Sequence, residues 1–170
     1  LVQNSGVIID DSGNVGINTV APAYKLDVAG FINTDQYSGY KQDGATILTA
    51  SSTNFATLVG NGAGAALLSD GLYNTAIGYQ ALNVATSSGY NTAVGYKALY
   101  SNTTGNNNTA NGINSIRSNT TGNNNTANGY ASLYSNTTGN SNTATGINSL
   151  YSNTTGTNNS ANGYYSLYTN

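Results

Sequence analysis

The stretch NTANGINSIRSNTTGNN, residues 108–124, decides how this chain folds, because near-copies of it recur at a constant interval. An asparagine opens each copy, and these asparagines are Asn74, Asn91, Asn108, Asn125, Asn142 and Asn159. Successive copies are therefore 17 residues apart, without an insertion. We number the positions of a copy from this asparagine as columns 1 to 17. Such a repeat predicts a stack of similar units, because each unit needs neighbours to bury its apolar side chains.

Five columns of the repeat are nearly invariant. Column 3 is always Ala, column 5 always Gly, column 6 Tyr or Ile, column 8 Ala or Ser, and column 9 Leu or Ile. A disordered Asn-rich tract is the alternative that this composition allows. Disorder gives no reason to keep these residues at constant spacing. Stacked coils do, because one inserted residue would shift every inward side chain out of register.

The residue types of the repeat favour strands and turns over helices. Asn, Thr, Ser and Gly disfavour helix interiors, and NTTG is typical of turns. We therefore predict an all-β fold, a β-solenoid or β-roll of 17-residue coils, with strands at NTAxGY and SLYSN and corners at the invariant Gly and at TTG. Equivalent residues should stack about 4.8 Å apart, so that Asn and Thr form ladders that hydrogen-bond to their own copies.

Columns 3, 6 and 9 supply the predicted interior of the coils. The predicted core residues are Ala93, Leu99, Ala110, Ile113, Ile116, Ala127, Tyr130, Leu133, Ala144, Ile147, Leu150, Tyr164 and Leu167. These few apolar groups offset only part of the conformational entropy that ordering a coil costs. Sharing the apolar side with identical chains would increase the buried area, so we expect a homo-oligomer, most simply a homotrimer.

The chain divides into two predicted regions. Residues 1–54 form a β-rich connector, in which VIIDDSGNVGI predicts a hairpin and KLDVAGFI a further strand beyond Pro22. Residues 55–170 form the repeat shaft, with a lead-in coil at 55–73 and regular repeats at 74–170. The segment VGNGAG at 59–64 lacks the strand–helix context of a phosphate-binding loop, so we interpret it as a glycine corner of the lead-in coil.

Composition excludes several classes of function. Only 6% of residues are charged, the net charge is −2, and Cys, His, Met, Trp and Glu are absent. This charge does not suit a basic nucleic-acid surface, and no apolar run reaches the roughly 20 residues of a membrane span. All six Asp residues precede residue 71, and Lys97 and Arg117 are the charged residues after it.

The sequence also gives little support for catalysis or metal binding. Glycoside hydrolysis usually needs two carboxyl groups about 5–9.5 Å apart, and the neighbours Asp10 and Asp11 would face opposite ways in a strand. Calcium-binding β-rolls carry carboxylates at their turns, whereas the corners here carry Asn and Thr. Adjacent Thr residues of the TTG rows cannot form a single flat array for ice binding. We predict that the chain is not an enzyme and uses no cofactor or metal.

Column 10 offers the best candidates for ligand contact. It contains Tyr100, Tyr134, Tyr151 and Tyr168, interrupted by Asn83 and Arg117. Tyrosines beside asparagines can stack on a sugar and hydrogen-bond to it, so glycan contact is one hypothesis. Packing of these rings between chains is the other.

Two segments resemble known fibre proteins. The units NTAIGYQAL and NTAVGYKAL are similar to the NSxAIG-type repeats of trimeric autotransporter adhesin heads, which are β-rolls, and to repeat shafts of bacteriophage tail fibres. The segment at 5–30 resembles the dGNVGIGTxxPxxKLDVxG motif of tail-fibre-like proteins, with Asn18 where that motif has Gly. The matches cover about residues 5–30 and 55–170, and the 17-residue period is longer than the coils usual in adhesin heads.

The resemblance implies a structural fibre outside a cell or on a virion. Its expected work is reach and surface attachment, with copies of itself as partners, and a cell-surface glycan or receptor as a further expected partner. A multivalent carbohydrate-binding module with a Tyr/Asn face is the alternative. Neither nucleic acid binding nor membrane insertion by this segment is expected.

Overall fold

A computed structural model describes residues 6–19, 21–28, 40–42, 45–50, 55–68 and 70–169, and within these ranges it contains strands and no helix. The predicted all-β β-solenoid with 17-residue coils is confirmed. The chain forms two compact units, Leu1–Thr34 and Asp35–Asn170. The predicted boundary between residues 54 and 55 adjoins residues 51–54, which are outside the described residues. Strands β4 (Tyr40–Gln42) and β5 (Ala45–Ala50), which lie in the predicted connector, pair in the sheet of the second unit.

The first unit contains the predicted hairpin. Strand β1 (Val7–Ile9) pairs antiparallel with β2 (Val15–Ile17), which pairs in parallel with β3 (Leu26–Val28). Asp10 closes the turn by accepting hydrogen bonds from the Asn14 and Ser12 N–H groups, at 2.8 and 3.0 Å. The Asn14 N–H group is the main cause that holds the pKa of Asp10 below its usual value. Residues 29–32 of the predicted third strand lie outside the described residues.

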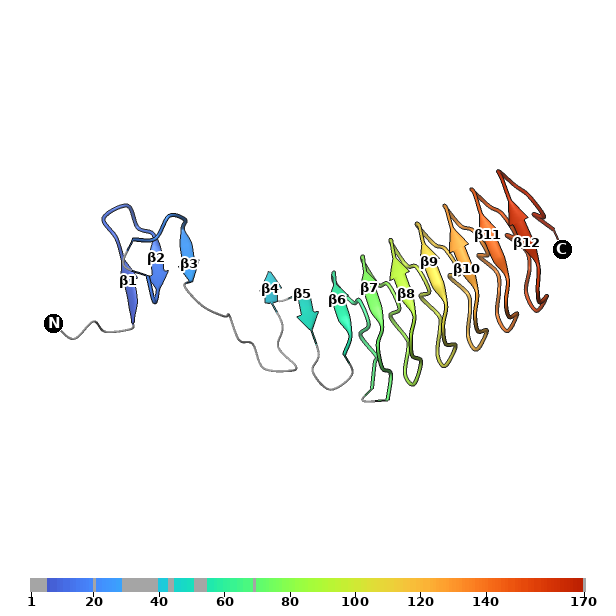
Figure 1. The fold of residues 1–170 in the computed structure, drawn as a ribbon, viewed down its shortest axis with the longest axis horizontal. Helices are drawn as coiled ribbons and strands as arrows, with labels where there is room; N and C mark the ends of the chain where they lie inside the picture. The colour runs from blue at the N-terminus through green and yellow to red at the C-terminus, as the bar shows by residue number, and fades with distance from the viewer. Residues whose placement is uncertain are drawn as a thin grey trace. The chain divides into compact units, whose positions relative to one another are not determined.

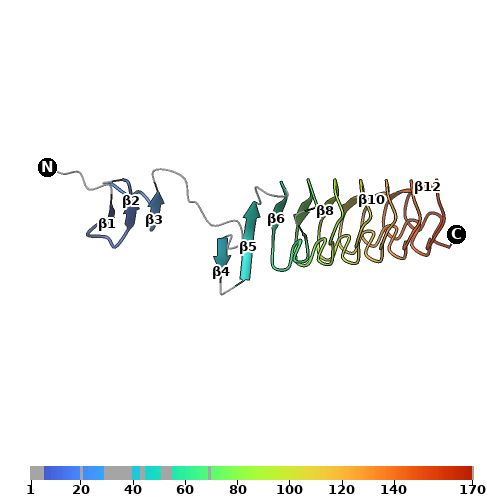
Figure 2. The same ribbon diagram turned by 90° about the horizontal axis from the view of Figure 1, so that it is seen from below.

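The second unit is built on a nine-stranded sheet in the order β12-β11-β10-β9-β8-β7-β6-β5-β4 (Figure 1). Its remaining strands are β6 (Thr57–Val59), β7 (Thr75–Ile77), β8 (Thr92–Val94), β9 (Thr109–Asn111), β10 (Thr126–Asn128), β11 (Thr143–Thr145) and β12 (Ser160–Asn162). Strands β6 to β12 are parallel, and β7 to β12 pair column for column, as in Ala127 with Ala110 and Ala144. Strands β4 and β5 join antiparallel at one end (Figure 2).

Each regular coil has one three-residue strand at columns 2 to 4, so the predicted second strand at SLYSN is wrong. That segment is a turn, because columns 7 and 9 both have left-handed backbone. Ala131 has φ 49° and Leu133 has φ 53°, and Ile116 keeps φ 46° although it is β-branched. The peptide groups still bond between coils: Ala131 N–H donates to Ile113 O and Leu133 N–H to Ser149 O, both at 2.9 Å.

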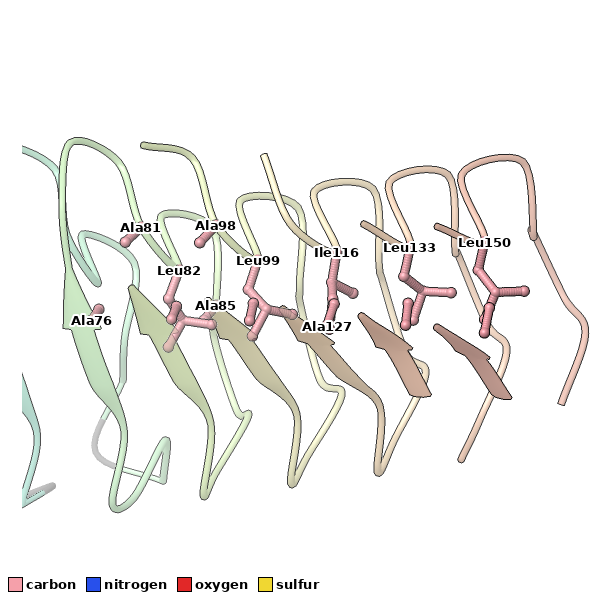
Figure 3. Close-up of a cluster of buried hydrophobic side chains, with 14 residues drawn as sticks. Ala76, Ala81, Leu82, Ala85, Ala98, Leu99, Ile116, Ala127, Leu133 and Leu150 are labelled. Carbon is pink, nitrogen blue, oxygen red and sulfur yellow. The ribbon is translucent and has the colours of Figure 1, made fainter. Parts of the chain in front are cut away.

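The interior of the stack is an apolar row of column 3 alanines and column 9 leucines (Figure 3). Among the predicted core residues, the following are fully buried: Ala93, Leu99, Ala110, Ile116, Ala127, Leu133, Ala144 and Leu150. Leu58 of the lead-in coil and Leu67 pack against the same cluster. Columns 3 and 9 therefore form one apolar core through the first five regular coils.

The prediction that column 6 points inward is wrong. The side chains of Ile113, Tyr130, Ile147 and Tyr164 are 46% to 74% exposed. The glycine before each of them, such as Gly129 with φ 138°, turns the backbone so that the next side chain leaves the interior. Leu167 is also exposed (48%), because within the described residues its coil has a neighbouring coil on one side only.

Asparagine ladders fill the rest of the interior, and the predicted Asn ladders are confirmed. In column 1, Asn125 Nδ2 donates to Asn108 Oδ1 at 3.1 Å and to its own coil's Gly139 O at 2.8 Å. In column 12, Asn136 Nδ2 donates to Asn119 Oδ1 at 2.8 Å and also to Gly139 O, at 3.0 Å. The column 15 carbonyl thus joins the two ladders. Buried amides are tolerated because their hydrogen-bonding groups are paired.

Threonines also form a ladder along the stack, and its acceptors are backbone carbonyls. The column 13 hydroxyls donate to the carbonyl of the threonine in the next coil, as Thr103 does to Thr120 O at 2.9 Å, and not to its hydroxyl.

Columns 12 and 15 change together in the first regular coil. There Ala85 replaces the asparagine and Ser88 replaces the glycine, and both side chains are buried. In the other coils, a Cβ on the column 15 glycine would meet the column 12 amide oxygen of its own coil, as at Gly139 with Asn136 Oδ1. Glycine is therefore required where column 12 is Asn, and Ala85 makes room for Ser88.

Candidate functional site

Aromatic and cationic side chains of columns 6, 7 and 10 form a connected row along the solenoid. We call it the aromatic–cationic row, and it consists of Tyr79, Tyr96, Lys97, Tyr100, Arg117, Tyr134, Tyr151, Tyr168, Tyr165 and Tyr164. Each member contacts the next through ring stacking or a cation over a ring. The row therefore extends from the first regular coil to the last.

The backbone of the turn places these side chains. Columns 5, 7 and 9 have positive φ in every regular coil, so the backbone of this segment is turned at alternate residues and is not an extended strand. In the first five regular coils, columns 8 and 9 are buried. Columns 6, 7 and 10 are exposed or half-buried, with the exception of the buried Ala131 in column 7. Because the coils repeat in register, side chains of one column stack along the solenoid at about the distance between strands.

Three tyrosines of column 10 stack face to face. The ring centres of Tyr134 and Tyr151 are 5.0 Å apart at an interplanar angle of 6°, and those of Tyr151 and Tyr168 are 5.0 Å apart at 10°. Stacking of this kind stabilises the contact between coils. It also covers the faces of the rings, so that the middle ring, Tyr151, has only its edge and hydroxyl for other partners.

Arg117 occupies column 10 between two tyrosines. Its guanidinium carbon lies 5.7 Å from the ring centre of Tyr100 and 5.6 Å from that of Tyr134. Its Nη1 donates a hydrogen bond to the Tyr134 hydroxyl at 2.6 Å. A planar guanidinium stacks on aromatic rings, so Arg117 continues the stack and adds a positive charge to it.

Lys97 brings a second positive charge to the same row. Its Nζ lies 5.3 Å from the ring centre of Tyr96 and 5.4 Å from that of Tyr100. Lys97 thereby connects the column 6 tyrosines with column 10. No carboxylate occurs in residues 71–170 of the sequence to neutralise either cation.

The position of Tyr151 within the stack affects its ionisation. Partial removal from water raises the pKa of Tyr151, and the neighbouring Tyr134 and Tyr168 raise it further. The row therefore favours the neutral phenol at Tyr151, which leaves its hydroxyl as a hydrogen-bond donor and acceptor near neutral pH.

The structure brings the predicted glycan-contact residues into one row. Tyr134, Tyr151 and Tyr168 form one stack, and Tyr100 lies on the other side of Arg117. Lys97 and the column 6 tyrosines were not predicted to be neighbours of the column 10 tyrosines. One feature of the sequence could have indicated these neighbours: the two charged residues after residue 71 lie in columns 7 and 10 of the repeat.

A second aromatic stack lies at the beginning of the solenoid. Phe55 stacks on Tyr73 with ring centres 5.3 Å apart, and Tyr73 on Tyr90 at 5.1 Å. It belongs to column 17 and the equivalent positions before it, and it ends where Asn107 replaces the aromatic residue. This stack is short and carries no charge.

The described part of the chain holds no group of three or more His, Cys, Asp or Glu side chains that could surround a metal ion. The described ranges contain no helix with the length and apolarity that a membrane crossing requires. Asp10 closes a turn, and its neighbour Asp11 is exposed.

Comparison with known proteins finds no matching family model, no matching curated protein and no matching solved structure.

Proposed function

We propose that this chain is a segment of a fibre shaft that sets the reach between two attached parts. The observation that carries the proposal is that each regular coil bonds to both neighbours through its backbone. In one coil, Thr126 N–H donates to Asn142 O of the next coil, and Gly129 N–H to Asn111 O of the previous coil, both at 2.8 Å. A structure whose units contact only their neighbours adds length without changing its cross-section. The resemblance to tail-fibre and adhesin repeats points the same way, and a place outside a cell or on a virion is part of the proposal.

Inserting whole copies tests the shaft. We expect that adding residues 125–141 once or twice within the full chain lengthens the particle by about 4.8 Å per copy and leaves its cross-section unchanged. Small-angle scattering measures both quantities. The matched control inserts the same segment with one residue more, which should disturb the stack because every later side chain changes its facing. If the 17-residue and the 18-residue insertions lengthened the particle equally without disturbing it, the proposal that coils of constant length set the length of the shaft would be wrong.

The proposed shaft is a homo-oligomer, most simply a homotrimer, and we assign its contact to the outer face of the sheet. Column 4 lies on this face, where Val59, Ile77 and Val94 form an apolar ladder that is partly exposed. Sheet faces of this kind pack on one another. The aromatic–cationic row suits self-association less well, because Lys97 and Arg117 would approach their own copies.

A charge on the sheet face tests the oligomer. Val94→Asp should weaken association at least about tenfold, because it places a carboxylate of each chain in the apolar contact. Sedimentation equilibrium measures the effect, and refolding from denaturant at several chain concentrations should show concentration dependence in the unmodified chain. Thr104→Asp adds the same charge at an exposed turn position and should leave association unchanged. Refolding to a β-rich species of single-chain mass at every concentration would overturn the proposal.

A second candidate function is multivalent glycan binding. The observation that favours it is the aromatic–cationic row, which repeats hydroxyl-bearing side chains along the solenoid.

A further inference from the structure

We propose that the aromatic–cationic row binds an acidic polysaccharide, whose carboxylate or sulfate groups pair with Lys97 and Arg117 while its hydroxyls contact the tyrosine edges. This inference deepens the glycan-binding candidate by naming its ligand class. It does not depend on the fibre-shaft proposal, because it concerns the side chains of one chain.

The charge of the row carries the first part of the argument. Lys97 and Arg117 are the charged residues of 71–170, and both belong to this row. Among the described residues, neither forms an ion pair with a carboxylate. A pair of cations in a 100-residue stretch that otherwise carries no charge attracts a polyanion in preference to a neutral chain.

Lys97 and Arg117 lie close enough together to bind two anionic groups of one polysaccharide chain. Lys97 Nζ lies 5.4 Å and Arg117 Cζ 5.7 Å from the centre of the same ring, Tyr100. The two groups are therefore at most 11.1 Å apart, the sum of these distances. Arg117 is also held in place by the Tyr134 hydroxyl, and a pre-positioned cation loses less side-chain entropy when it binds.

The stacking geometry favours a sugar chain over a nucleic acid. Single-stranded nucleic acids bind through bases that stack on free aromatic faces, and here the faces of the column 10 rings cover one another. What remains is a series of ring edges and phenol hydroxyls. Such a surface hydrogen-bonds to a chain with many hydroxyls.

The repeat itself provides the test variants. Arg117→Tyr restores the residue found in column 10 of four coils, and Lys97→Asn introduces the residue found in column 7 at Asn114 and Asn148. Both changes remove a charge and keep a side chain that the coil accommodates, since Asn tolerates the left-handed backbone that Lys97 has at φ 53°. The charge-matched control is Lys25→Gln with Lys41→Gln, which removes the other two cations of the chain.

Affinity measurements on the full chain would use polygalacturonate and dextran sulfate as the two acidic probes. Neutral dextran and single-stranded oligothymidylate serve as comparisons. We expect the double variant Lys97→Asn/Arg117→Tyr to bind the acidic probes at least about fivefold more weakly, because two charge-assisted contacts are lost. The Lys25/Lys41 control should change binding less than twofold. Raising the salt concentration should weaken binding of the unmodified chain and affect the double variant less.

Several results would overturn the proposal. The first is that the Lys25/Lys41 control loses as much affinity for the acidic probes as the double variant does. The second is that the unmodified chain binds neutral dextran as tightly as the acidic probes. The others are tighter binding of oligothymidylate than of either acidic probe, and no measurable binding of an acidic probe. Preference for polygalacturonate or for dextran sulfate distinguishes carboxylate from sulfate as the recognised group. Circular dichroism of the double variant confirms that its coils remain folded, so that loss of binding reports on the row.

Discussion

Leu133→Asp is expected to destroy the stacking of the central coils. Leu133 is fully buried in column 9, in the apolar row between Ile116 and Leu150. Loss of a buried leucine alone costs about 2–5 kcal/mol, and a carboxylate without a partner in this place adds several kcal/mol. The whole free energy of unfolding of such a domain is about 5–15 kcal/mol. The expected result is loss of the β-sheet circular dichroism or a chain that unfolds at much lower urea concentration.

Thr138→Asp is the matched control for this change. Thr138 lies one turn further along the same coil and is exposed, so the same carboxylate is solvated there and should alter stability by less than about 0.5 kcal/mol. If both variants unfolded at the same urea concentration, column 9 would not be the interior of the coil.

Gly139→Ser is expected to have the second largest effect, and Asn136→Ala should partly reverse it. A Cβ at Gly139 would meet Asn136 Oδ1 of the same coil and the Gly156 carbonyl of the next. Overpacking of this kind costs about 1–3 kcal/mol. The pair Ala85 and Ser88 shows that serine is accommodated where column 12 is alanine.

A double-mutant cycle at these two positions measures the coupling. Asn136→Ala alone should also destabilise the chain, because it removes the acceptor of Asn153 Nδ2 and a donor to Gly139 O. The double variant should be more stable than the sum of the single effects predicts, by about 0.5–3 kcal/mol. Urea unfolding of the four proteins gives this value. If the effects of the two substitutions on the free energy of unfolding were additive, the joint occurrence of Ala85 and Ser88 in the first regular coil would have no steric cause.

The repeat period predicted the fold, because a stack of coils tolerates few departures from a constant length. Columns 3 and 9 were predicted to be buried, and the structure confirms this except at Leu167. Column 6 was assigned to the wrong side because Tyr and Ile suit an interior, and hydrophobicity alone does not report the turn that a glycine with φ near 130° makes before them.

The second predicted strand failed for a related reason. Leu, Ile and Tyr at SLYSN have good strand propensity, yet columns 7 and 9 have left-handed backbone at residues such as Lys97 and Leu99. Backbone propensity is overridden there by bonding between coils, since each such N–H group finds a carbonyl in a neighbouring coil. One sequence does not contain this information, because the bonding partner lies a whole coil away.

The candidate site was only partly predictable. The column 10 tyrosines were identified from their period, whereas the faces that they cover depend on a near-parallel stacking that the period does not specify. Lys97 was missed because it lies in column 7, whose side chains join column 10 only through the shape of the turn.

The asparagine ladders have a direction. In column 1, the backbone N–H of every asparagine from Asn91 onward donates to the side-chain oxygen of the asparagine in the previous coil. Most side-chain amides do the same, as Asn142 does to Asn125 Oδ1 at 3.1 Å, and column 12 has the same sense. The amide dipoles therefore align along the stack and do not cancel. The last column 1 asparagine, Asn159, donates to Asn142 in the same way, so its own Oδ1 is the acceptor that a following coil would meet. A further coil in the same orientation would offer that oxygen a donor, whereas a second stack approaching end to end in reverse would set acceptor against acceptor. The two ends of the solenoid are therefore chemically different. A coil added after its C-terminal coil is favoured in one orientation only.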